Sequence, residues 1–185
     1  MILDRDGVLN REAPDGGYIT SPGQWEWLPG AREALALLSG AGLRVSVATN
    51  QSAVGRGLMT AGDLEAVHDR MAWEAGLQGA KIAAVYSCPH APEAGCGCRK
   101  PAPGLIRQAV AESGVPAAET LVVGDALRDL QAAEAAGVPA ALVLTGKGRA
   151  TARSVGADRV PTYFDLRALA LAVVASVEHS RGSRT

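Results

Sequence analysis

The chain has almost no excess of charge of either sign and no long apolar run. Its 185 residues contain 18 Lys and Arg against 19 Asp and Glu, a formal net charge of −1 at pH 7. A balance this even offers no basic surface for nucleic acid or an anionic membrane. Hydrophobic residues make up 48% of the chain, yet no run approaches the roughly 20 that a membrane span requires. We therefore expect neither a nucleic-acid nor a membrane partner.

Cysteine is scarce, and a secretion signal is missing. Because the N-terminus lacks a basic segment followed by an apolar stretch and a cleavage site, we expect a cytoplasmic protein. In that reducing compartment the three cysteines favour metal binding or catalysis over a disulfide. The length suits one domain, over residues 1–178, with a sizeable core. Residues 179–185 (HSRGSRT) are expected to form a disordered polar tail.

Apolar stretches alternate with segments of helical period along the chain. This alternation predicts βαβ units and a doubly wound, Rossmann-like α/β fold, with a mostly parallel sheet and helices on both faces. Thr60 is expected to cap a helix together with Asp63. The expected strands are 1–4, 43–49, 81–87, 120–124 and 140–144, and the expected helices are 30–42, 60–76, 103–114, 126–137 and 164–177.

Polar residues gather at the carboxyl ends of the expected strands. Asp4 and Asp6 follow the first strand, residues 49–52 (TNQS) the second, and Asp125 the fourth. Doubly wound sheets bind ligands beyond this edge, so these groups should share one site. Asp4, Asp6 and Asp125 can converge as oxygen ligands of Mg²⁺, a hard cation that prefers carboxylates. The alternative is structural, with Asp4 and Asp6 capping a turn.

A cysteine cluster occupies residues 88–98 (CPHAPEAGCGC). It offers three thiolates and one imidazole, which complete a tetrahedral Zn²⁺ site with no open position. The zinc should therefore be structural, because a catalytic zinc needs a vacant position. Buried cysteines without a metal are the alternative, although a loop rich in Pro and Gly offers no core to bury them. The expected zinc ligands are Cys88, His90, Cys96 and Cys98.

Four segments, LDRDGVLN, ATNQS, CRKPAPG and VGDALRDL, resemble in that order the motifs of the haloacid dehalogenase (HAD) superfamily of phosphatases. The resemblance covers residues 1 to about 150. It implies that Asp4 attacks phosphorus and forms an aspartyl-phosphate, and that Asp6 protonates the leaving oxygen and then activates water. It also implies that Asp6 meets Mg²⁺ through its backbone carbonyl, which leaves its side chain free for proton transfer.

The same resemblance implies supporting roles. Thr49 would hold the phosphoryl group through its hydroxyl and backbone N–H, and Lys100 would neutralise the phosphoryl oxygens. Asp125 matches the metal ligand of the fourth motif, and Asp129 resembles the acid that orients the lysine or a metal-bound water. Taken alone, Thr49 can be a strand-end residue, Lys100 a surface lysine and Asp129 a helix-surface acid.

Two zinc-bearing groups of the superfamily are similar to this chain, the D-glycero-D-manno-heptose 1,7-bisphosphate 7-phosphatases and the histidinol-phosphate phosphatases. NQSAVGRG (50–57), DGGYI (15–19) and LVLTGKG (142–148) resemble the heptose group more closely. The small zinc loop and the short insertions elsewhere leave no room for a separate cap domain. The resemblance implies a Mg²⁺-dependent phosphatase that removes the 7-phosphate of the heptose bisphosphate, a precursor of lipopolysaccharide. The alternatives are a histidinol-phosphate phosphatase or a non-catalytic phospho-receiver. The implied substrate contacts are Asp15, Gly16, Gly17, Tyr18, Asn50, Gln51, Ser52 and Arg99.

Ala126 stands where some heptose phosphatases carry a basic residue. Recognition of the distal phosphate is therefore expected to depend on Arg99 or on other groups. Trp25 and Trp27 are expected to pack rather than to bind ligand. His68 falls on the apolar face of its helix, where we expect a core-edge residue. The small uncapped fold suits a monomer.

Overall fold

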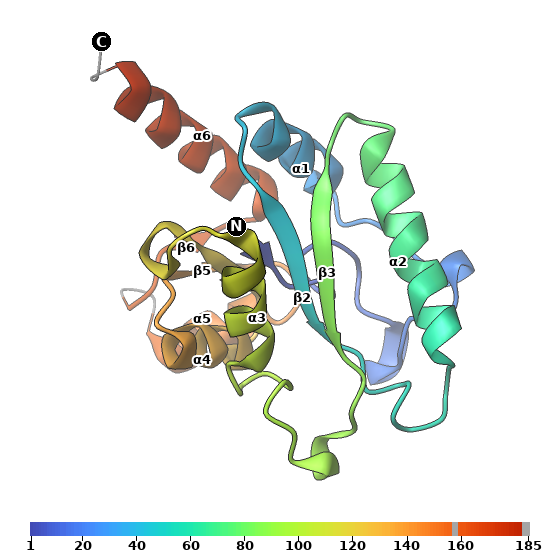
Figure 1. Cartoon of the computed structure of the whole chain (residues 1–185). Coiled ribbons are helices and arrows are strands. Elements are labelled where there is room, and N and C mark those ends of the chain that lie inside the picture. The colour runs from blue at the N-terminus through green and yellow to red at the C-terminus, as the bar shows by residue number, and fades with distance from the viewer. Residues whose placement is uncertain (157–158, 183–185) are drawn as a thin grey trace.

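A six-stranded sheet runs through the molecule in the order β3-β2-β1-β4-β5-β6, with every neighbouring pair parallel (Figure 1). The computed structural model describes residues 1–156 and 159–182, apart from the side chain of Asp15. In a sheet of this order, ligands bind where the order reverses, beyond the carboxyl ends of the central strands. The strands are β1 (Ile2–Leu3), β2 (Val45–Asn50), β3 (Ile82–Cys88), β4 (Val122–Gly124), β5 (Ala140–Val143) and β6 (Thr162–Tyr163).

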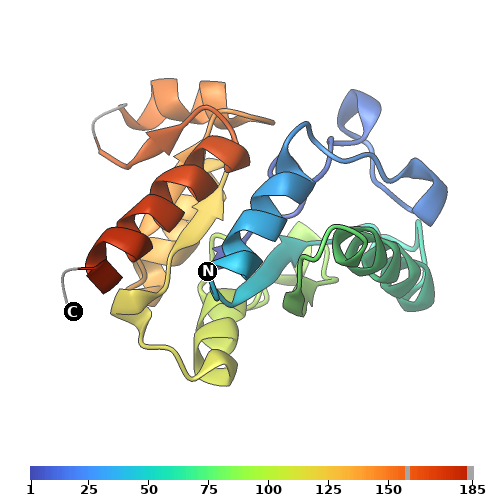
Figure 2. The ribbon, with the colours of Figure 1, turned by 90° about the horizontal axis from the view of Figure 1, so that it is seen from above.

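Helices cover both faces of the sheet (Figure 2). Those of the described residues are α1 (Ala31–Gly40), α2 (Ala61–Gly76), α3 (Gly104–Ser113), α4 (Leu127–Ala136), α5 (Gly148–Val155) and α6 (Leu166–Gly182). α1, α2 and α6 pack in the core cluster that contains Leu3, whereas α3 and α4 pack in the cluster that contains Ile2. Successive strand residues face opposite sides of a sheet, so the two clusters form its two faces.

The predicted doubly wound fold is confirmed, and so is the helix cap at residue 60. Thr60 Oγ1 accepts a hydrogen bond from the Asp63 backbone N–H at 3.1 Å, and Asp63 Oδ2 accepts one from the Thr60 N–H at 2.8 Å. α3 and α4 both end at a glycine in the left-handed region, Gly114 and Gly137. Glycine adopts this conformation without the steric penalty of a Cβ.

Three features differ from the sequence prediction. β6 and α5 were not predicted, because β6 has only two residues and α5 (GRATARSV) has only eight, few of which are apolar. α6 continues to Gly182, so the predicted disordered tail is wrong for residues 179–182. Packing stabilises this extension, since Arg181 Nη2 donates a hydrogen bond to the Ala41 carbonyl at 3.3 Å. Residues 183–185 of the predicted tail lie outside the described residues.

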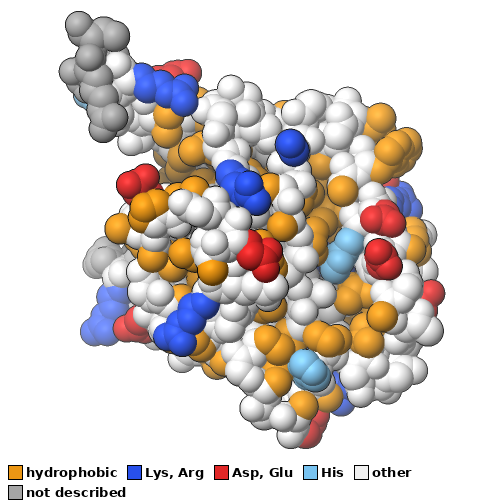
Figure 3. All heavy atoms as spheres, in the orientation of Figure 1, with side chains coloured by type: hydrophobic (Ala, Val, Ile, Leu, Met, Phe, Trp, Pro, Cys, Tyr) orange, Lys and Arg blue, Asp and Glu red, His pale blue; other side chains and the backbone are white. Residues whose placement is uncertain are grey.

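The loops at the carboxyl edge of the sheet consist of irregular chain and single 3₁₀ turns. After β1 the chain passes through two single-turn 3₁₀ helices, Pro14–Gly16 and Pro22–Gln24, before α1 begins. No segment within the described residues forms a separate cap over this edge. None of the helices in the described ranges has the length and hydropathy to cross a bilayer. On the face drawn in Figure 3, Lys and Arg lie scattered among Asp and Glu rather than in one patch.

Candidate active site

Three buried aspartates meet at the carboxyl ends of β1 and β4. Asp4 follows β1, Asp125 follows β4, and Asp129 lies in the first turn of α4. Each offers an oxygen, and these oxygens lie within 4.8 Å of one another. The pairing of Leu3 with Val123 brings the two strand ends side by side, which explains why residues far apart in sequence meet here.

One cation, Lys100, is buried among these carboxylates. Its Nζ donates hydrogen bonds to Asp4 Oδ1 and to the Ala48 carbonyl, both at 2.8 Å, and forms an ion pair with Asp129 Oδ1 at 2.7 Å. Burial opposes the charge of the ammonium, but Asp129 and Asp4 outweigh this effect and raise the pKa of Lys100. Lys100 therefore stays charged and fixes the orientation of the Asp4 carboxylate.

Two carboxylate oxygens of the cluster have no partner. Asp4 Oδ2 and Asp125 Oδ1 are buried and accept no hydrogen bond from any described residue. Burial raises the pKa of Asp4 to about 6, against the opposing charge of Lys100. Burial and then repulsion from Asp4 raise the pKa of Asp125 to about 7. Carboxylates that lack donors and outnumber their cation are a donor set that fits a hard divalent ion such as Mg²⁺.

Backbone closes around Asp125 from two loops. The Lys147 backbone N–H donates a hydrogen bond to Asp125 Oδ2 at 2.7 Å. A Cβ at Gly7 would lie 2.2 Å from Asp125 Oδ2, and a Cβ at Gly146 would lie 2.1 Å from the same oxygen. Both glycines also have positive φ, +87° and +51°. Only glycine fits either position, so the wall of this site consists of main chain.

The Asp6 carboxylate is held by a separate set of donors. Asn10 Nδ2 donates to its Oδ1 at 2.9 Å, Arg5 Nη2 donates to the same oxygen at 3.0 Å, and Gln51 Nε2 donates to Oδ2 at 2.7 Å. Burial opposes ionisation, but Arg5 and the hydrogen bonds outweigh it and lower the pKa of Asp6. At rest Asp6 is therefore ionised, which is the form of a general base.

A pocket of about 230 Å³ opens beside these groups. Its lining includes every predicted substrate contact except Asp15, whose side chain lies outside the described residues. Two of these contacts have amides that are engaged within the protein. Gln51 bonds Arg5, Asp6 and Thr49. Asn50 bonds the Lys100 carbonyl and backbone N–H at 2.9 and 3.0 Å. The predicted residues that line the pocket are Gly16, Gly17, Tyr18, Asn50, Gln51, Ser52 and Arg99.

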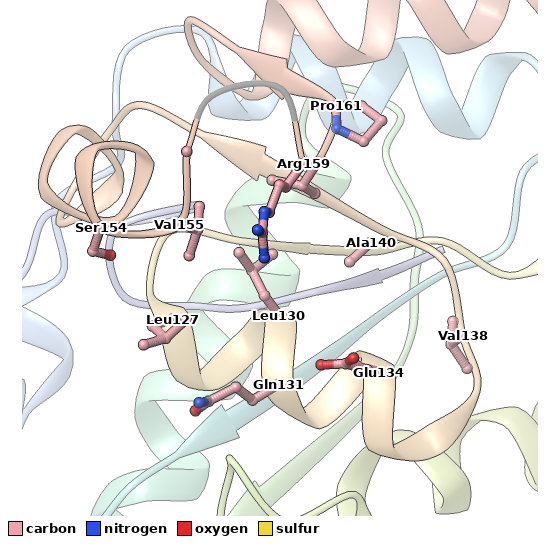
Figure 4. A pocket seen from close by; sticks show the side chains of 12 residues that line it. Leu127, Leu130, Gln131, Glu134, Val138, Ala140, Ser154, Val155, Arg159 and Pro161 are labelled. Atoms are coloured by element: carbon pink, nitrogen blue, oxygen red, sulfur yellow. The ribbon is translucent and has the colours of Figure 1, made fainter.

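A larger groove, of about 840 Å³, lies between α4, β5 and the end of α5 (Figure 4). Leu127, Leu130 and Pro161 contribute apolar surface, and Arg159 reaches across toward Leu130. Neither Asp6 nor any predicted substrate contact lines this groove, whereas Asp6 and all of those contacts except Asp15 line the smaller pocket. Size therefore does not identify the site, and the chemistry lies in the smaller pocket.

The predicted zinc ligands also come together. The Sγ atoms of Cys88, Cys96 and Cys98 lie 3.2 to 3.6 Å apart, and His90 Nδ1 lies 3.6 and 3.3 Å from two of them. A disulfide has an S–S distance of about 2.05 Å, so these cysteines are free thiols in contact. Converging Cys₃His donors fit a closed Zn²⁺ site. Lys100 follows Cys98 by two residues, so the loop that holds this site also positions the buried lysine.

Comparison with known proteins places the chain in a family. A model described as HAD-hydrolase-like matches residues 97–168. The D-glycero-beta-D-manno-heptose-1,7-bisphosphate 7-phosphatase of Bordetella bronchiseptica is 45% identical over 82% of this chain and 83% of its own length. The chain belongs to the heptose-1,7-bisphosphate 7-phosphatase family. The motif resemblance to this group of HAD phosphatases is thereby confirmed.

Other members of the heptose-bisphosphate phosphatase family extend the match. The beta-anomer enzyme of Pseudomonas aeruginosa is 41% identical, over 94% of this chain and 97% of that protein. A relative from Mycobacterium tuberculosis, named for the alpha anomer, is 38% identical over all of this chain and 94% of its own. The crystal structure of the B. bronchiseptica enzyme complexed with magnesium and phosphate superposes with a TM-score of 0.90, at 41% identity, covering 95% of this chain and 98% of that one.

Several residues of this family member escaped the sequence analysis. Arg5, Arg128 and Lys147 line the pocket and carry positive charge. Arg128 makes no hydrogen bond or ion pair with any described residue, and its Nε is buried without a partner. Arg128 lies two residues after Ala126, the position where some heptose phosphatases carry a basic residue, so the sequence could have indicated Arg128 as a substitute. Lys147, in contrast, pairs with Glu12 at 2.5 Å.

Proposed function

We propose that this protein removes the 7-phosphate from D-glycero-D-manno-heptose 1,7-bisphosphate. The observation that carries the proposal is the buried Asp4–Asp125–Asp129 cluster with its unpartnered oxygens, next to a pocket that is lined by the ionised Asp6 and by Arg128, which has no partner among the described residues. The names of the relatives supply the substrate, at 38 to 45% identity over most of the chain. Which anomer is preferred is left to the assay below, because relatives of both kinds match.

In this proposal Asp4 is the nucleophile and Lys100 fixes its carboxylate through Oδ1. Asp6, which is ionised at rest, first takes up a proton from solvent. Asp4 then forms a bond to phosphorus as the bond from phosphorus to the sugar oxygen O7 breaks, and Asp6 gives that oxygen the proton. Asp6 then takes a proton from water as the water oxygen attacks phosphorus, which frees Asp4 and releases phosphate. Asp4 and Asp125 would hold Mg²⁺, whose charge would stabilise the phosphoryl oxygens.

The second phosphate of the substrate needs cations whose N–H donors are not already engaged by the protein. Arg128 is one such group, because it has no partner among the described residues. Arg99 is another, since among the described residues its guanidinium bonds only the His90 carbonyl, from Nη1 at 3.4 Å. Arginine binds phosphate in a bidentate manner, so this pair suits a sugar with two phosphates better than histidinol phosphate, which has one. Arg128 thus offers the cation that Ala126 lacks.

The test is phosphate release from a panel of substrates, with and without Mg²⁺. The panel contains both anomers of the heptose bisphosphate, the heptose 7-phosphate and histidinol phosphate. We expect the highest kcat/KM for one anomer of the bisphosphate, with dependence on Mg²⁺ and no turnover by Asp4→Asn. Asp69→Asn, at an exposed position of α2, is the matched control. A preference for histidinol phosphate, or turnover by Asp4→Asn at the parent rate, would contradict the proposal.

A cytoplasmic location, a monomeric state, and the lack of nucleic-acid or membrane partners remain predictions from the sequence. Size-exclusion chromatography with light scattering tests the monomer, and cell fractionation tests the location.

A further inference from the structure

The residue between Asp4 and Asp6 in the sequence is a buried arginine, Arg5. Arg5 is 1% exposed, although arginine is among the residues that proteins least often bury. Its Nε and Nη2 both donate to Asp6 Oδ1, at 3.3 and 3.0 Å, and Nη2 also donates to Gln51 Oε1 at 3.0 Å. The guanidinium carbon lies 5.9 Å from the centre of the Trp25 ring. Arg5 is therefore fixed on several sides.

The remaining contact of Arg5 is with His68 of α2. Arg5 Nη1 lies 3.2 Å from His68 Nε2, across 63 positions of sequence. Because a guanidinium has only donors, His68 Nε2 must accept this hydrogen bond and the imidazole must carry its proton on Nδ1. Burial, with the neighbouring charge of Arg5, lowers the pKa of His68 to about 4, so the ring is neutral at physiological pH. His68 acts here as an acceptor and not as a charge.

The chain of contacts from His68 ends at both oxygens of Asp6. Arg5 holds Oδ1 directly. It also holds Gln51 Oε1, which turns the amide so that Gln51 Nε2 donates to Asp6 Oδ2 at 2.7 Å and to Thr49 Oγ1 at 2.8 Å. A change in the orientation of Arg5 would therefore move the carboxylate through two routes at once.

We propose that His68 is a positioning residue for this enzyme, which fixes the Arg5 guanidinium so that Arg5 and Gln51 together hold the Asp6 carboxylate where it exchanges protons with substrate and water. This inference rests on the proposed function, because that function makes Asp6 the acid and base. Without an acceptor at position 68, Arg5 Nη1 is buried without a partner, and the guanidinium is expected to shift from its position against Asp6 and Gln51 to find another acceptor. A displacement of a catalytic group by about 1 Å costs on the order of 10²-fold in rate.

The test compares His68→Met with His68→Gln. Methionine fills the volume without an acceptor at the place of Nε2, whereas the glutamine side chain brings an amide oxygen there. We expect kcat on the heptose bisphosphate to fall about 10- to 100-fold in His68→Met with KM within about twofold, and kcat to remain within about threefold of the parent in His68→Gln. His179→Met, the same change at an exposed position of α6, is the matched control.

Equal kcat values in the Met and Gln variants, or an effect on KM alone, would overturn the inference. Thermal unfolding of each variant separates misfolding from misplacement. If His68→Met does not fold, His68→Asn replaces it, because this amide is too short to reach Arg5, and it must show the same loss of kcat. A parent protein that does not hydrolyse the bisphosphate at all would contradict the proposed function itself, which is a different outcome from equal kcat values in the two variants.

Discussion

The buried Asp125 allows a test in which stability and activity should change in opposite directions. Burial, followed by repulsion from Asp4, raises the pKa of Asp125 from 3.8 to about 7. At pH 8 the metal-free protein thus buries an ionised carboxylate whose Oδ1 has no partner. Asparagine has the same shape, keeps an oxygen for the Lys147 N–H and carries no charge. We expect Asp125→Asn to stabilise the metal-free protein and to abolish its activity.

The magnitude follows from the shift in pKa. A shift of about three pKa units corresponds to about 4 kcal/mol between the folded and unfolded states. The buried amide still requires partners of its own, which reduces the expected gain to about 1 to 3 kcal/mol. For a chain of this length each kcal/mol raises the melting temperature by about 2 to 4 °C, so the variant should melt roughly 2 to 12 °C higher.

The pH dependence has a definite sign. Because the pKa of Asp125 is higher in the folded than in the unfolded chain, the folded state binds the extra proton between pH 3.8 and about 7. The free energy of unfolding of the parent therefore falls as the pH rises through this window, whereas this contribution is missing from the variant. The gain at pH 5.5, near the middle of the window, should be smaller than that at pH 8 by about 2 kcal/mol, because the cost of the buried amide is the same at both pH values.

The assay is thermal unfolding of the parent, Asp125→Asn and the control Asp69→Asn at pH 5.5 and 8. Mg²⁺ is removed by exhaustive dialysis and not with a strong chelator, so that zinc remains bound. Added Mg²⁺ should raise the melting temperature of the parent and leave that of Asp125→Asn unchanged, because a ligand stabilises only the state that binds it. The reasoning is refuted if Asp125→Asn is no more stable than the parent at pH 8, or if its gain is the same at both pH values.

Three further changes test other parts of the site. Asp4→Asn should lower kcat by about 10³-fold or more while circular dichroism shows an intact fold, since it removes the nucleophile. Arg128→Gln should lower the ratio of kcat/KM for the bisphosphate to kcat/KM for the 7-monophosphate by about 10- to 100-fold. The control Arg153→Gln, at an exposed position of α5, should leave this ratio unchanged. Equal losses of kcat/KM on both substrates would argue against a contact between Arg128 and the second phosphate. His90→Ala should release zinc, measured by atomic absorption, and increase hydrogen exchange in residues 88–100. KM should rise, while the melting temperature should stay close to that of the parent.

Much of the fold could be predicted from local sequence patterns, and the site from the residues that follow the predicted strands. Asp4 and Asp125 were found because polar residues after apolar strands mark the ligand-binding edge of a parallel sheet. α5 was missed because it is short and has few apolar residues, so its position depends on tertiary contacts. The contact between Arg5 and His68 was missed for a different reason. It joins residues far apart in sequence through the direction of two side chains, which no periodicity encodes.

The pair of indoles beside Arg5 gives the enzyme a built-in optical signal. Trp25 is 4% exposed, and its ring meets that of Trp27 edge to face with centroids 5.1 Å apart. The remaining tryptophan of the chain, Trp73, is 65% exposed on α2. Replacing it by phenylalanine would confine the tryptophan fluorescence to Trp25 and Trp27, and the Trp25 ring lies against the guanidinium that holds Asp6. Stopped-flow emission from such a protein would follow events around that carboxylate in real time, without a dye or a coupled reaction.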